Sequence, residues 1–466
     1  MAAGVSSMGQ VESLFLSCGV KQVYIKKLAP RQDNEKNQIV LGSAGAKNVL
    51  MLFPATMNYR PSSKSEKKRN SQAGEPIVEM LLDFYWLDQS GSRHQAPNAK
   101  IINYFQYPEA RFSGFASGCP QRPDCLMRRN KPWEFGKRYI ILGANVESGE
   151  TFGLVINERD DPLASQFPAL SPYRPVPVLQ THLFGYSAEY TPEDLLVDEL
   201  QSICGRWHPS TRLKFQGEKP IPFKGNQGAG YTLEAHLNVP SNALKEPDKH
   251  GFEIKSYSKG GKISLMTPTA DMGEEGLLKF REFMEKYGWP PVKDKSLSLV
   301  FNGAFRYRKE KKLQHIGRTC LLDVHAYDHV HDDFDTYDVA GPHIKIDDIE
   351  ENILVSGWSL TKLLTSWNAK HASACYVEYE KRKYSGKDAG HDFEYRYTGK
   401  VFICEGTDIW AFLRGISEQV IYYDPGHDIT VSGKSNQRPQ WRMSVRKTFE
   451  KDLSVLYDNV TVIQLV

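Results

Sequence analysis

The chain has 466 residues and a mass of 52.9 kDa, and its 59 Lys and Arg against 56 Asp and Glu give a formal net charge of +3. Hydrophobic residues make up 40%, charged residues 25% and aromatic residues 11%, proportions that exclude fibrous and intrinsically disordered proteins. At roughly 100–200 residues per domain, the length predicts two or three compact units. The charge excess is too small to indicate nucleic-acid binding unless basic residues cluster.

Neither a membrane span nor a metal-binding cysteine pattern is visible. The longest apolar runs, such as 49–53, fall far short of the roughly 18 residues that a bilayer-spanning helix needs. The first 20 residues lack the features of a secretory signal, so we expect a cytoplasmic protein without membrane association. The seven cysteines are odd in number and form no C-x-x-C pair, which argues against a disulfide scaffold and a cysteine-rich zinc site.

Short strand-like runs separated by turn residues fill the first half of the chain. They lie at 23–25, 38–41, 48–53, 77–86, 101–107, 139–142 and 152–156. Many short strands with little helical period predict a mostly-β barrel or sandwich. The Pro- and Ser-rich segment 159–177 is typical of a connector, so we place the first domain at 1–180 and the second at 181–466.

The second half mixes helix and strand signals. Thr191-Pro192-Glu193-Asp194 has a capping residue, a proline and two acids, the pattern of a helix start. Helical spacing also appears at 232–237 and 274–287, and the second of these helices would put five apolar residues on one side: Leu277, Leu278, Phe280, Phe283 and Met284. Strand signals at 252–254, 297–301, 375–379 and 401–403 make this half α/β or α+β.

Charged residues at 246–255 form the strongest candidate for chemistry. Alternation along a strand would put Glu253 and Lys255 on one face, with Phe252 and Ile254 toward the core. A turn at 249–251 would bring Asp248 back beside Glu253. Two carboxylates and an ammonium group are what Mg²⁺-dependent phosphodiester hydrolysis requires.

The Glu-x-Lys pattern alone is weak support for this interpretation. It occurs two more times, at Glu66/Lys68 and Glu310/Lys312, but there within charge runs that lack alternating apolar neighbours and a preceding Pro-Asp. The alternative for Glu253/Lys255 is a solvated strand edge with ordinary surface charges.

The order of motifs around this segment adds to the residue-level interpretation. Gly230-Tyr231-Thr232-Leu233-Glu234, Pro247-Asp248 and Glu253-Ile254-Lys255 follow one another. This series resembles the MvaI/BcnI restriction endonucleases, which are relatives of the nickase MutH in the PD-(D/E)xK superfamily. The resemblance implies an α/β restriction-endonuclease-like domain that cleaves double-stranded DNA with Mg²⁺.

The same resemblance implies a role for each of these residues. Asp248 and Glu253 would be metal ligands, Lys255 the lysine that activates water or stabilises charge, and Glu234 a helix carboxylate beside the site. For Glu234 an equally good alternative is an acid near a helix N-terminus, where the dipole favours it.

Two segments near the C-terminus, 421–428 and 438–442, resemble the base-reading part of the same family. Arginine suits bidentate contact with guanine, and aspartate accepts a hydrogen bond from cytosine N4. The candidate base readers are Asp424, His427, Arg438 and Arg442. The alternative is a solvated loop rich in Arg and Trp.

Two further DNA-contacting arms are indicated in the first half. Segment 99–115, together with 84–88, resembles the N-terminal effector domain of the EcoRII endonuclease, a pseudobarrel related to the plant B-three type of DNA-binding domain. That resemblance implies two arms that grip the major groove, one with Glu109 and Arg111, the other at 26–38 with Arg31, Asn34 and Lys36. A charged hairpin loop is the alternative for the second arm.

The combination of an EcoRII-like domain with an MvaI-like domain resembles the UbaLAI type of restriction endonuclease. It implies a prokaryotic type II enzyme that acts on double-stranded DNA at CCWGG, with Mg²⁺, as a monomer without an obligatory protein partner. Two rival functions remain: a non-catalytic DNA-binding protein with two modules and a MutH-like nickase. A zinc site at His325 and His329, whose His-x-x-x-His spacing would place both on one helical face, is a further alternative.

Overall fold

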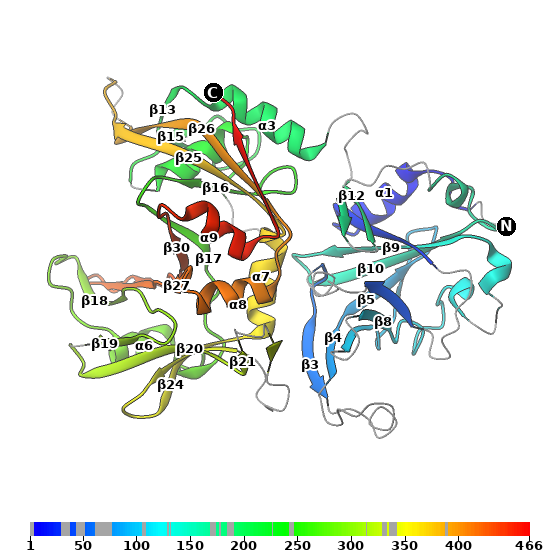
Figure 1. The fold of residues 1–466 in the computed structure, drawn as a ribbon, viewed down its shortest axis with the longest axis horizontal. Coiled ribbons are helices and arrows are strands. Elements are labelled where there is room, and N and C mark those ends of the chain that lie inside the picture. The colour runs from blue at the N-terminus through cyan, green and yellow to red at the C-terminus, as the bar shows by residue number, and fades with distance from the viewer. Residues whose placement is uncertain are drawn as a thin grey trace. The chain divides into compact units, whose positions relative to one another are not determined.

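The computed structural model divides into two compact units, residues 1–192 and 193–466. It describes residues 4–28, 38–42, 52–60, 77–104, 109–127, 130, 132–167, 174–176, 179–183, 191–225, 227–241, 247–313, 315–328, 333–334, 343–386 and 390–466. In Figure 1 the first unit runs from blue to cyan-green and the second from green to red.

The first unit is built from two sheets. The larger has the order β11-β12-β1-β9-β10-β5-β6 and the smaller β2-β8-β7-β4-β3. The larger consists of β11 (Arg174–Val176), β12 (Leu179–Leu183), β1 (Gln22–Lys27), β9 (Arg138–Asn145), β10 (Glu150–Asn157), β5 (Asp83–Leu87) and β6 (Arg93–Gln95). The smaller consists of β2 (Ile39–Gly42), β8 (Glu109–Ser113), β7 (Lys100–Tyr104), β4 (Ile77–Leu81) and β3 (Thr56–Arg60).

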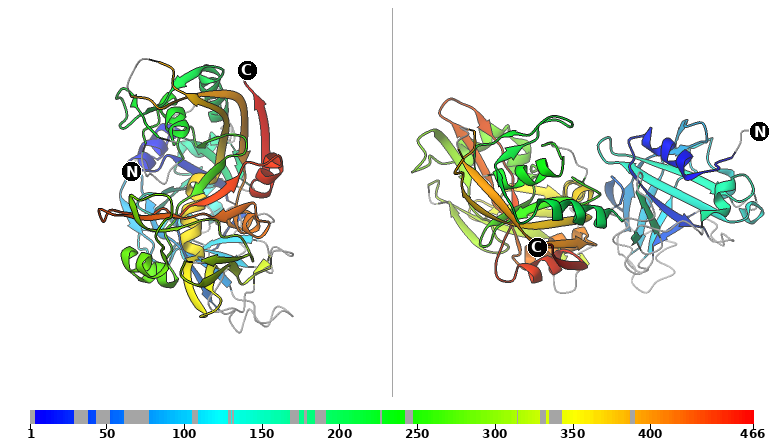
Figure 2. Two further views of the ribbon diagram at one scale, coloured as in Figure 1. Left: turned by 90° about the vertical axis from the view of Figure 1, so that its left-hand side faces the viewer. Right: turned by 90° about the horizontal axis from the view of Figure 1, so that it is seen from above.

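Both faces of the larger sheet are buried, which explains why its central strands are apolar throughout. Along β9, Ile140 and Leu142 pack with the smaller sheet, whereas Ile141 packs with Phe15 of helix α1 (Met8–Leu16). Figure 2 shows α1 lying against this sheet. The Trp86 indole, buried between the sheets, donates to the Phe115 carbonyl over 2.8 Å.

Most of the strands expected in this half are present. The run 77–86 is divided in two at Leu82, because β4 and β5 belong to different sheets. Of the run 48–53, residues 48–51 lie outside the described residues, and Leu52 and Phe53 form a bend rather than a strand. Strand β12 spans the predicted domain boundary at residue 180 and pairs with β1, with Leu183 opposite Gln22.

The second unit begins with the helix that the Thr-Pro-Glu-Asp sequence indicated, α3 (Pro192–Ile203). Its main sheet has the order β13-β26-β25-β16, and β31 also pairs with β26. These strands are β13 (Trp207–Pro209), β26 (Phe393–Glu405), β25 (Ser373–Lys383), β16 (Glu253–Tyr257) and β31 (Asn459–Gln464). Strand β16 is parallel to β25, and α4 (Gly228–His236) shares a buried core with both.

The described part of this unit also contains three sheets of three or four strands and, after residue 359, three helices. The sheets have the orders β17-β30-β27, β18-β28-β29 and β19-β20-β23-β24. Their strands are β17 (Lys262–Met266), β30 (Trp441–Ser444), β27 (Ile421–Tyr423), β18 (Leu297–Asn302), β28 (Gly426–Thr430), β29 (Ser435–Asn436), β19 (Glu310–Leu313), β20 (Arg318–His325), β23 (His343–Asp348) and β24 (Ile353–Ser359). The helices are α7 (Leu360–His371), α8 (Ile409–Ser417) and α9 (Phe449–Leu456).

The prediction of a single helix at 274–287 is wrong. Two helices occupy it, α5 (Gly273–Leu277) and α6 (Phe280–Tyr287), because Leu278 and Lys279 are extended. The Lys279 backbone N–H donates to the Glu282 carboxylate over 3.0 Å, so a local cap starts a new helix. Phe283 and Met284 are buried as expected, but Leu277 is 83% exposed.

No helix among the described residues is long and apolar enough to span a membrane. All seven cysteines are buried and unpaired with one another.

Candidate active site

A tight turn places Asp248 beside the start of β16. Lys249 and Phe252 exchange two backbone hydrogen bonds across His250 and Gly251, whose φ angles of 48° and 80° are left-handed. Glycine adopts that conformation without strain at the second position. Asp248 accepts a hydrogen bond at Oδ2 from the Ile254 backbone N–H over 3.0 Å. The turn that the sequence predicted therefore brings Asp248 back onto the strand of Glu253.

A residue of helix α3 holds this turn in place through two contacts with its side chains. Glu199 binds Lys249 Nζ over 3.0 Å through Oε2 and His250 Nε2 over 2.9 Å through Oε1. Lys249 also donates to the Leu237 carbonyl over 2.9 Å, just after α4. Two helices thus position the backbone that carries Asp248.

Glu253 and Lys255 form an ion pair at the start of β16. Lys255 Nζ lies 2.5 Å from Glu253 Oε1, and the two side chains are 21% and 3% exposed. Phe252 and Ile254 are buried in the core shared with α4, which confirms their predicted direction. The alternative of a solvated strand edge is wrong, because a surface carboxylate would not be buried to this extent.

The charge state of Lys255 depends on three carboxylates. Burial lowers the pKa of its ammonium group, but Glu253, Asp248 and Glu234 together outweigh that effect and raise the pKa above 10.5. Lys255 is therefore a fixed positive charge near neutral pH. The structure brings together the four residues that the motif order singled out.

Glu234 approaches this group from α4. A Cβ atom added to Gly230 would lie 3.8 Å from Glu234 Oε1 and 3.9 Å from Ser256 Oγ on β16, so the carboxylate lies toward the strand. Because α4 begins at Gly228, Glu234 lies in its last turn. The alternative of an acid at a helix N-terminus is therefore wrong, since the dipole disfavours a carboxylate at a helix C-terminus.

The carboxylates of Asp248 and Glu253 suit Mg²⁺ better than they suit a metal ion whose ligands all come from the protein. Among the described residues, no group of three or more His, Cys, Asp or Glu side chains is arranged to hold a metal. Mg²⁺ keeps several water molecules and is usually held by one or two carboxylates together with substrate phosphate oxygens. Asp248 and Glu253 carry carboxylate oxygens of the kind that could hold this ion.

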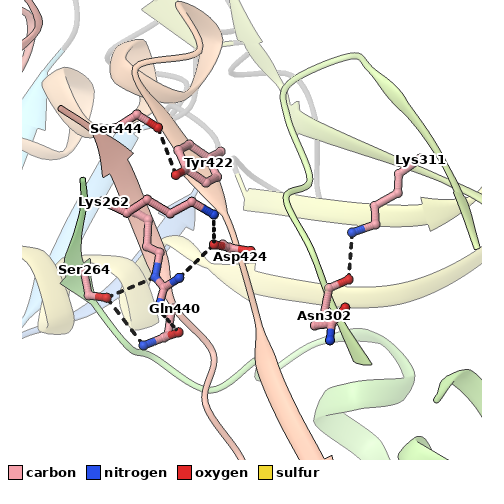
Figure 3. Close-up of polar contacts among 9 residues, drawn as sticks. Lys262, Ser264, Asn302, Lys311, Tyr422, Asp424, Gln440 and Ser444 are labelled. Carbon is pink, nitrogen blue, oxygen red and sulfur yellow. Dashed lines mark hydrogen bonds and ion pairs between the residues drawn. The ribbon is translucent and has the colours of Figure 1, made fainter. Parts of the chain in front are cut away.

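A second polar cluster surrounds Asp424, just after β27. Arg442 donates to Asp424 Oδ2 over 2.8 Å and Lys262 to the same oxygen over 3.0 Å, although this carboxylate is only 9% exposed. Figure 3 shows the side chains of Lys262 and Asp424 pointing toward one another. Two of the predicted base readers, Asp424 and Arg442, therefore contact each other directly.

The sequence interpretation missed three members of this cluster. Lys262 and Ser264 come from β17, the strand that follows β16, and Gln440 precedes β30. Ser264 Oγ lies 3.2 Å from Arg442 Nε and 3.4 Å from Gln440 Nε2. Alternation of polar and apolar residues over 262–266 is the sequence signal that would have found the first two.

His427 is buried with both ring nitrogens engaged. Its Nδ1 accepts from the Arg438 backbone N–H over 2.9 Å, and its Nε2 lies 3.1 Å from Glu275 Oε1 and 3.3 Å from the Tyr423 hydroxyl. The side chain has no solvent exposure. In this arrangement His427 presents no ring nitrogen to a DNA base and instead holds the backbone of Arg438.

Arg438 has the exposure expected of a contact residue. Its side chain is 54% exposed, and Nη1 lies 3.5 Å from Asp428 Oδ2. It stands on the strand-to-strand connection that His427 holds, between β29 and β30. The exposed guanidinium on a fixed backbone makes Arg438 the most accessible of the four predicted base readers.

The predicted arms of the first unit are described only in part. Arg31, Asn34 and Lys36 lie outside the described residues, and Glu109 is described as the first residue of β8 without its side chain. Arg111 lies opposite Val40 of β2, and its Nη1 donates to Gln38 Oε1 over 3.4 Å. A hydrogen bond therefore links the two segments that were predicted to form the arms, 99–115 and 26–38.

The zinc alternative is not supported at His325. This residue ends strand β20, so it cannot share a helical face with the residue four positions later. Its ring lies 4.6 Å from that of His343 on the paired strand β23. His329 lies outside the described residues.

Two carboxylates and a charged lysine at one end of a mixed sheet are the groups that a nuclease active site uses. The model of the MvaI/BcnI restriction endonuclease family matches residues 198–457, which is more than half of the chain. The chain therefore belongs to that family, and the family resemblance seen in the sequence is confirmed.

Solved structures similar to the chain include two of the restriction endonuclease MvaI. One is the complex of MvaI with its cognate DNA substrate, with 18% identity and a TM-score of 0.44. The other is MvaI in the absence of DNA, with 16% identity and a TM-score of 0.32. Each match covers 60% of this chain and all of the MvaI chain. No curated protein matches the chain.

Proposed function

We propose that this protein is a type II restriction endonuclease that hydrolyses phosphodiester bonds of double-stranded DNA at CCWGG and requires Mg²⁺. The observation that carries the proposal is the buried Glu253–Lys255 pair with Asp248 and Glu234 around it, in a chain of the MvaI/BcnI family. Burying a carboxylate and a charged lysine costs desolvation free energy. A pair retained despite this cost points to a functional site.

In this proposal Asp248 and Glu253 hold Mg²⁺. When bound, the ion supplies Lewis-acid chemistry at the scissile phosphate and lowers the pKa of a coordinated water molecule. Lys255, kept charged by its three carboxylate neighbours, stabilises negative charge that develops at phosphorus or orients the attacking water. Glu234 acts on Lys255 from α4 and does not need to touch the metal.

Base reading is assigned to the residues after β27. Arg438 and Arg442 suit guanine edges and Asp424 suits cytosine, and all three lie on or beside strands of one unit with the catalytic residues. His427 has a positioning role in this proposal, since its ring nitrogens are engaged within the protein.

The first unit is proposed to be an EcoRII-like pseudobarrel of the plant B-three type that binds DNA through Arg31, Asn34, Lys36, Glu109 and Arg111. With one catalytic group of residues per chain, the proposed monomer makes one nick per binding event. Cleavage of both strands then needs two successive events or two protein copies. Such an enzyme would act in the cytoplasm of a prokaryote, as the UbaLAI-type resemblance implies.

Cleavage of a plasmid carrying CCWGG sites tests the proposal. The full-length protein is incubated with Mg²⁺ or with EDTA, and the ends are mapped. Cuts confined to CCWGG that require Mg²⁺ and disappear in Asp248→Asn support it. Cuts at another sequence overturn the specificity but keep the nuclease, persistent single nicks favour the nickase, and sequence-specific binding without cleavage favours the non-catalytic alternative.

A further inference from the structure

The three-stranded sheet β17-β30-β27 has one apolar face and one polar face. Ile263, Leu265, Trp441 and Met443 are buried, and the alternating residues Lys262, Ser264, Arg442 and Ser444 form what we call the polar face. Lys262 is paired with Ser444, and Ser264 with Arg442. Figure 1 draws this sheet between β16 and β20. A row of hydroxyls and cations therefore begins five residues after the catalytic strand ends.

The polar face continues into a pocket of about 210 Å³. Its lining residues are Arg306, Lys309, Gln419, Val420, Ser444 and Arg446. We call this the basic pocket, because three of these six residues are cationic and none is acidic. The donors come from three separate segments of the chain, which is why the sequence did not reveal the site.

Tyr422 joins the polar face to the basic pocket. The Arg306 guanidinium lies 4.1 Å from the Tyr422 ring centroid and Lys262 Nζ lies 5.9 Å from it. The Tyr422 hydroxyl lies 3.1 Å from Ser444 Oγ, as Figure 3 shows. Because this ring is almost fully buried in β27, it offers a fixed surface that Arg306 of the pocket and Lys262 of the polar face both approach.

The other two cations are held by their backbone or by a neighbour while their side chains remain exposed. Lys309 donates its backbone N–H to the Arg306 carbonyl over 3.1 Å. This hydrogen bond closes a turn whose first and last residues both line the pocket. Arg446 contacts Asp452 through Nε and Nη2, both over 3.2 Å. Asp452 thus holds the half-exposed Arg446 guanidinium in place at the pocket and leaves Nη1 available to a ligand.

We propose that the basic pocket binds a phosphate group of the DNA backbone. The proposal rests on DNA being the substrate, as proposed above. Cations and a hydroxyl without a lining carboxylate are the donors of a phosphate site, whereas the Asp424 cluster next to it also offers an acceptor suited to a base. The pocket therefore fixes the register of the duplex and does not read its sequence.

Salt dependence of binding tests this role. Binding of the full-length protein to two duplexes, with and without CCWGG, is followed by fluorescence anisotropy in EDTA between 50 and 200 mM salt. Each phosphate contact contributes about 0.9 to the slope of log K against log salt. The variant Lys309→Gln/Arg446→Gln should lower the slope by about 0.9 and weaken both duplexes equally. Lys309→Gln alone, at an exposed position, should act in the same direction without disturbing the fold.

The control removes two lysines far along β25. Lys381→Gln/Lys383→Gln changes net charge equally, at positions seven to nine residues beyond the Ala374 that faces Glu253, about 25 Å along the strand. It should leave the slope unchanged. An equal slope in the pocket variant and wild type, or a loss confined to the CCWGG duplex, overturns the proposal.

A free phosphate compound is the other source of the same chemistry. Inorganic phosphate is titrated into the wild-type protein and the pocket variant by calorimetry. If phosphate binding disappears in the variant while the DNA slope stays unchanged, the pocket serves a small phosphate ligand, which overturns the assignment to DNA. These measurements follow binding without Mg²⁺ and do not depend on cleavage. If the wild-type protein binds DNA with the expected slope but does not cleave it with Mg²⁺, the proposed function is contradicted and the pocket assignment stands.

Discussion

The Arg438 backbone N–H donates to Nδ1 of His427 over 2.9 Å. Because Nδ1 is an acceptor, the proton of the neutral ring is on Nε2, which then donates to the Glu275 carboxylate 3.1 Å away. Glu275, on α5, is 152 residues away in sequence and almost fully buried. A helix in the middle of the unit therefore sets the position of an exposed arginine near the C-terminus.

Replacing His427 by alanine should both destabilise the protein and blur its sequence preference. The change leaves the buried Glu275 carboxylate without its imidazole partner, which costs about 2–4 kcal/mol of unfolding free energy. It also frees the Arg438 backbone. Urea unfolding measures the first effect, and the ratio of affinities for the cleaved sequence and a single-base-pair variant measures the second.

The double variant His427→Leu/Glu275→Leu separates these effects. It removes both polar groups and should recover part of the lost stability, because no buried carboxylate is left unpartnered. The sequence preference should stay low, since nothing accepts from the Arg438 N–H. Full discrimination in either variant would contradict the positioning role.

Glu253→Gln should abolish cleavage and keep DNA binding. Glutamine preserves the size of the side chain but cannot supply a charged ligand or hold the charge of Lys255, so we expect the cleavage rate to fall at least about 100-fold. Single-turnover cleavage and anisotropy on the same duplex measure the two properties. Glu310→Gln, in the second described Glu-x-Lys pattern on exposed strand β19, should change neither. Equal losses in both variants would contradict the assignment.

Lys255 should stay charged across the whole working pH range. Its pKa lies above the ordinary 10.5, so this residue produces no decline of the cleavage rate up to about pH 9.5. Glu234→Gln removes one of the three carboxylates that raise the pKa, and the rate should fall by less than about tenfold because the metal ligands remain. A pH–rate profile checks both points. A wild-type alkaline limb that moves to higher pH in Lys255→Arg would show that Lys255 titrates in range.

The clustering of Asp248, Glu253 and Lys255 was predictable because these residues are close in sequence. A Pro-Asp, a turn and a Glu-x-Lys on an alternating strand define positions through local rules of backbone geometry, and the structure follows them. The motif Gly-Tyr-Thr-Leu-Glu placed Glu234 on the neighbouring helix for the same reason.

Features that depend on distant partners were not predictable. The periodicity at 274–287 is compatible with one helix, but a cap between Lys279 and Glu282 decides for two. His427 has the sequence surroundings of a solvated loop, and only its contact with Glu275 removes it from the surface. Lys262 joins Asp424 across 162 residues. No local pattern indicates which of many surface lysines makes such a contact.

Lys311 should make the stability of the protein depend on alkaline pH. Burial lowers the pKa of its ammonium group to about 8, and the nearby Asp424 opposes that effect only in part. The group donates to the Asn302 carbonyl over 2.8 Å, as Figure 3 shows. It also lies 4.2 Å from the Phe305 ring centroid. Between pH 8 and the unfolded value of 10.5, the unfolded chain holds a proton that the folded protein has released, so the free energy of unfolding rises with pH in this window.

The difference between wild type and Lys311→Met isolates this contribution, since methionine keeps the packing against Phe305. At pH 7 the variant should be more stable, by about 3 kcal/mol at most, and its advantage should shrink as pH rises from 8 to 10. Urea unfolding at several pH values measures the difference. Lys312→Met, at the next and exposed position of β19, should show no such pH-dependent gain. If the difference in unfolding free energy between wild type and Lys311→Met stays constant across this range, the pKa of Lys311 is the same in the folded and the unfolded protein, which contradicts the prediction.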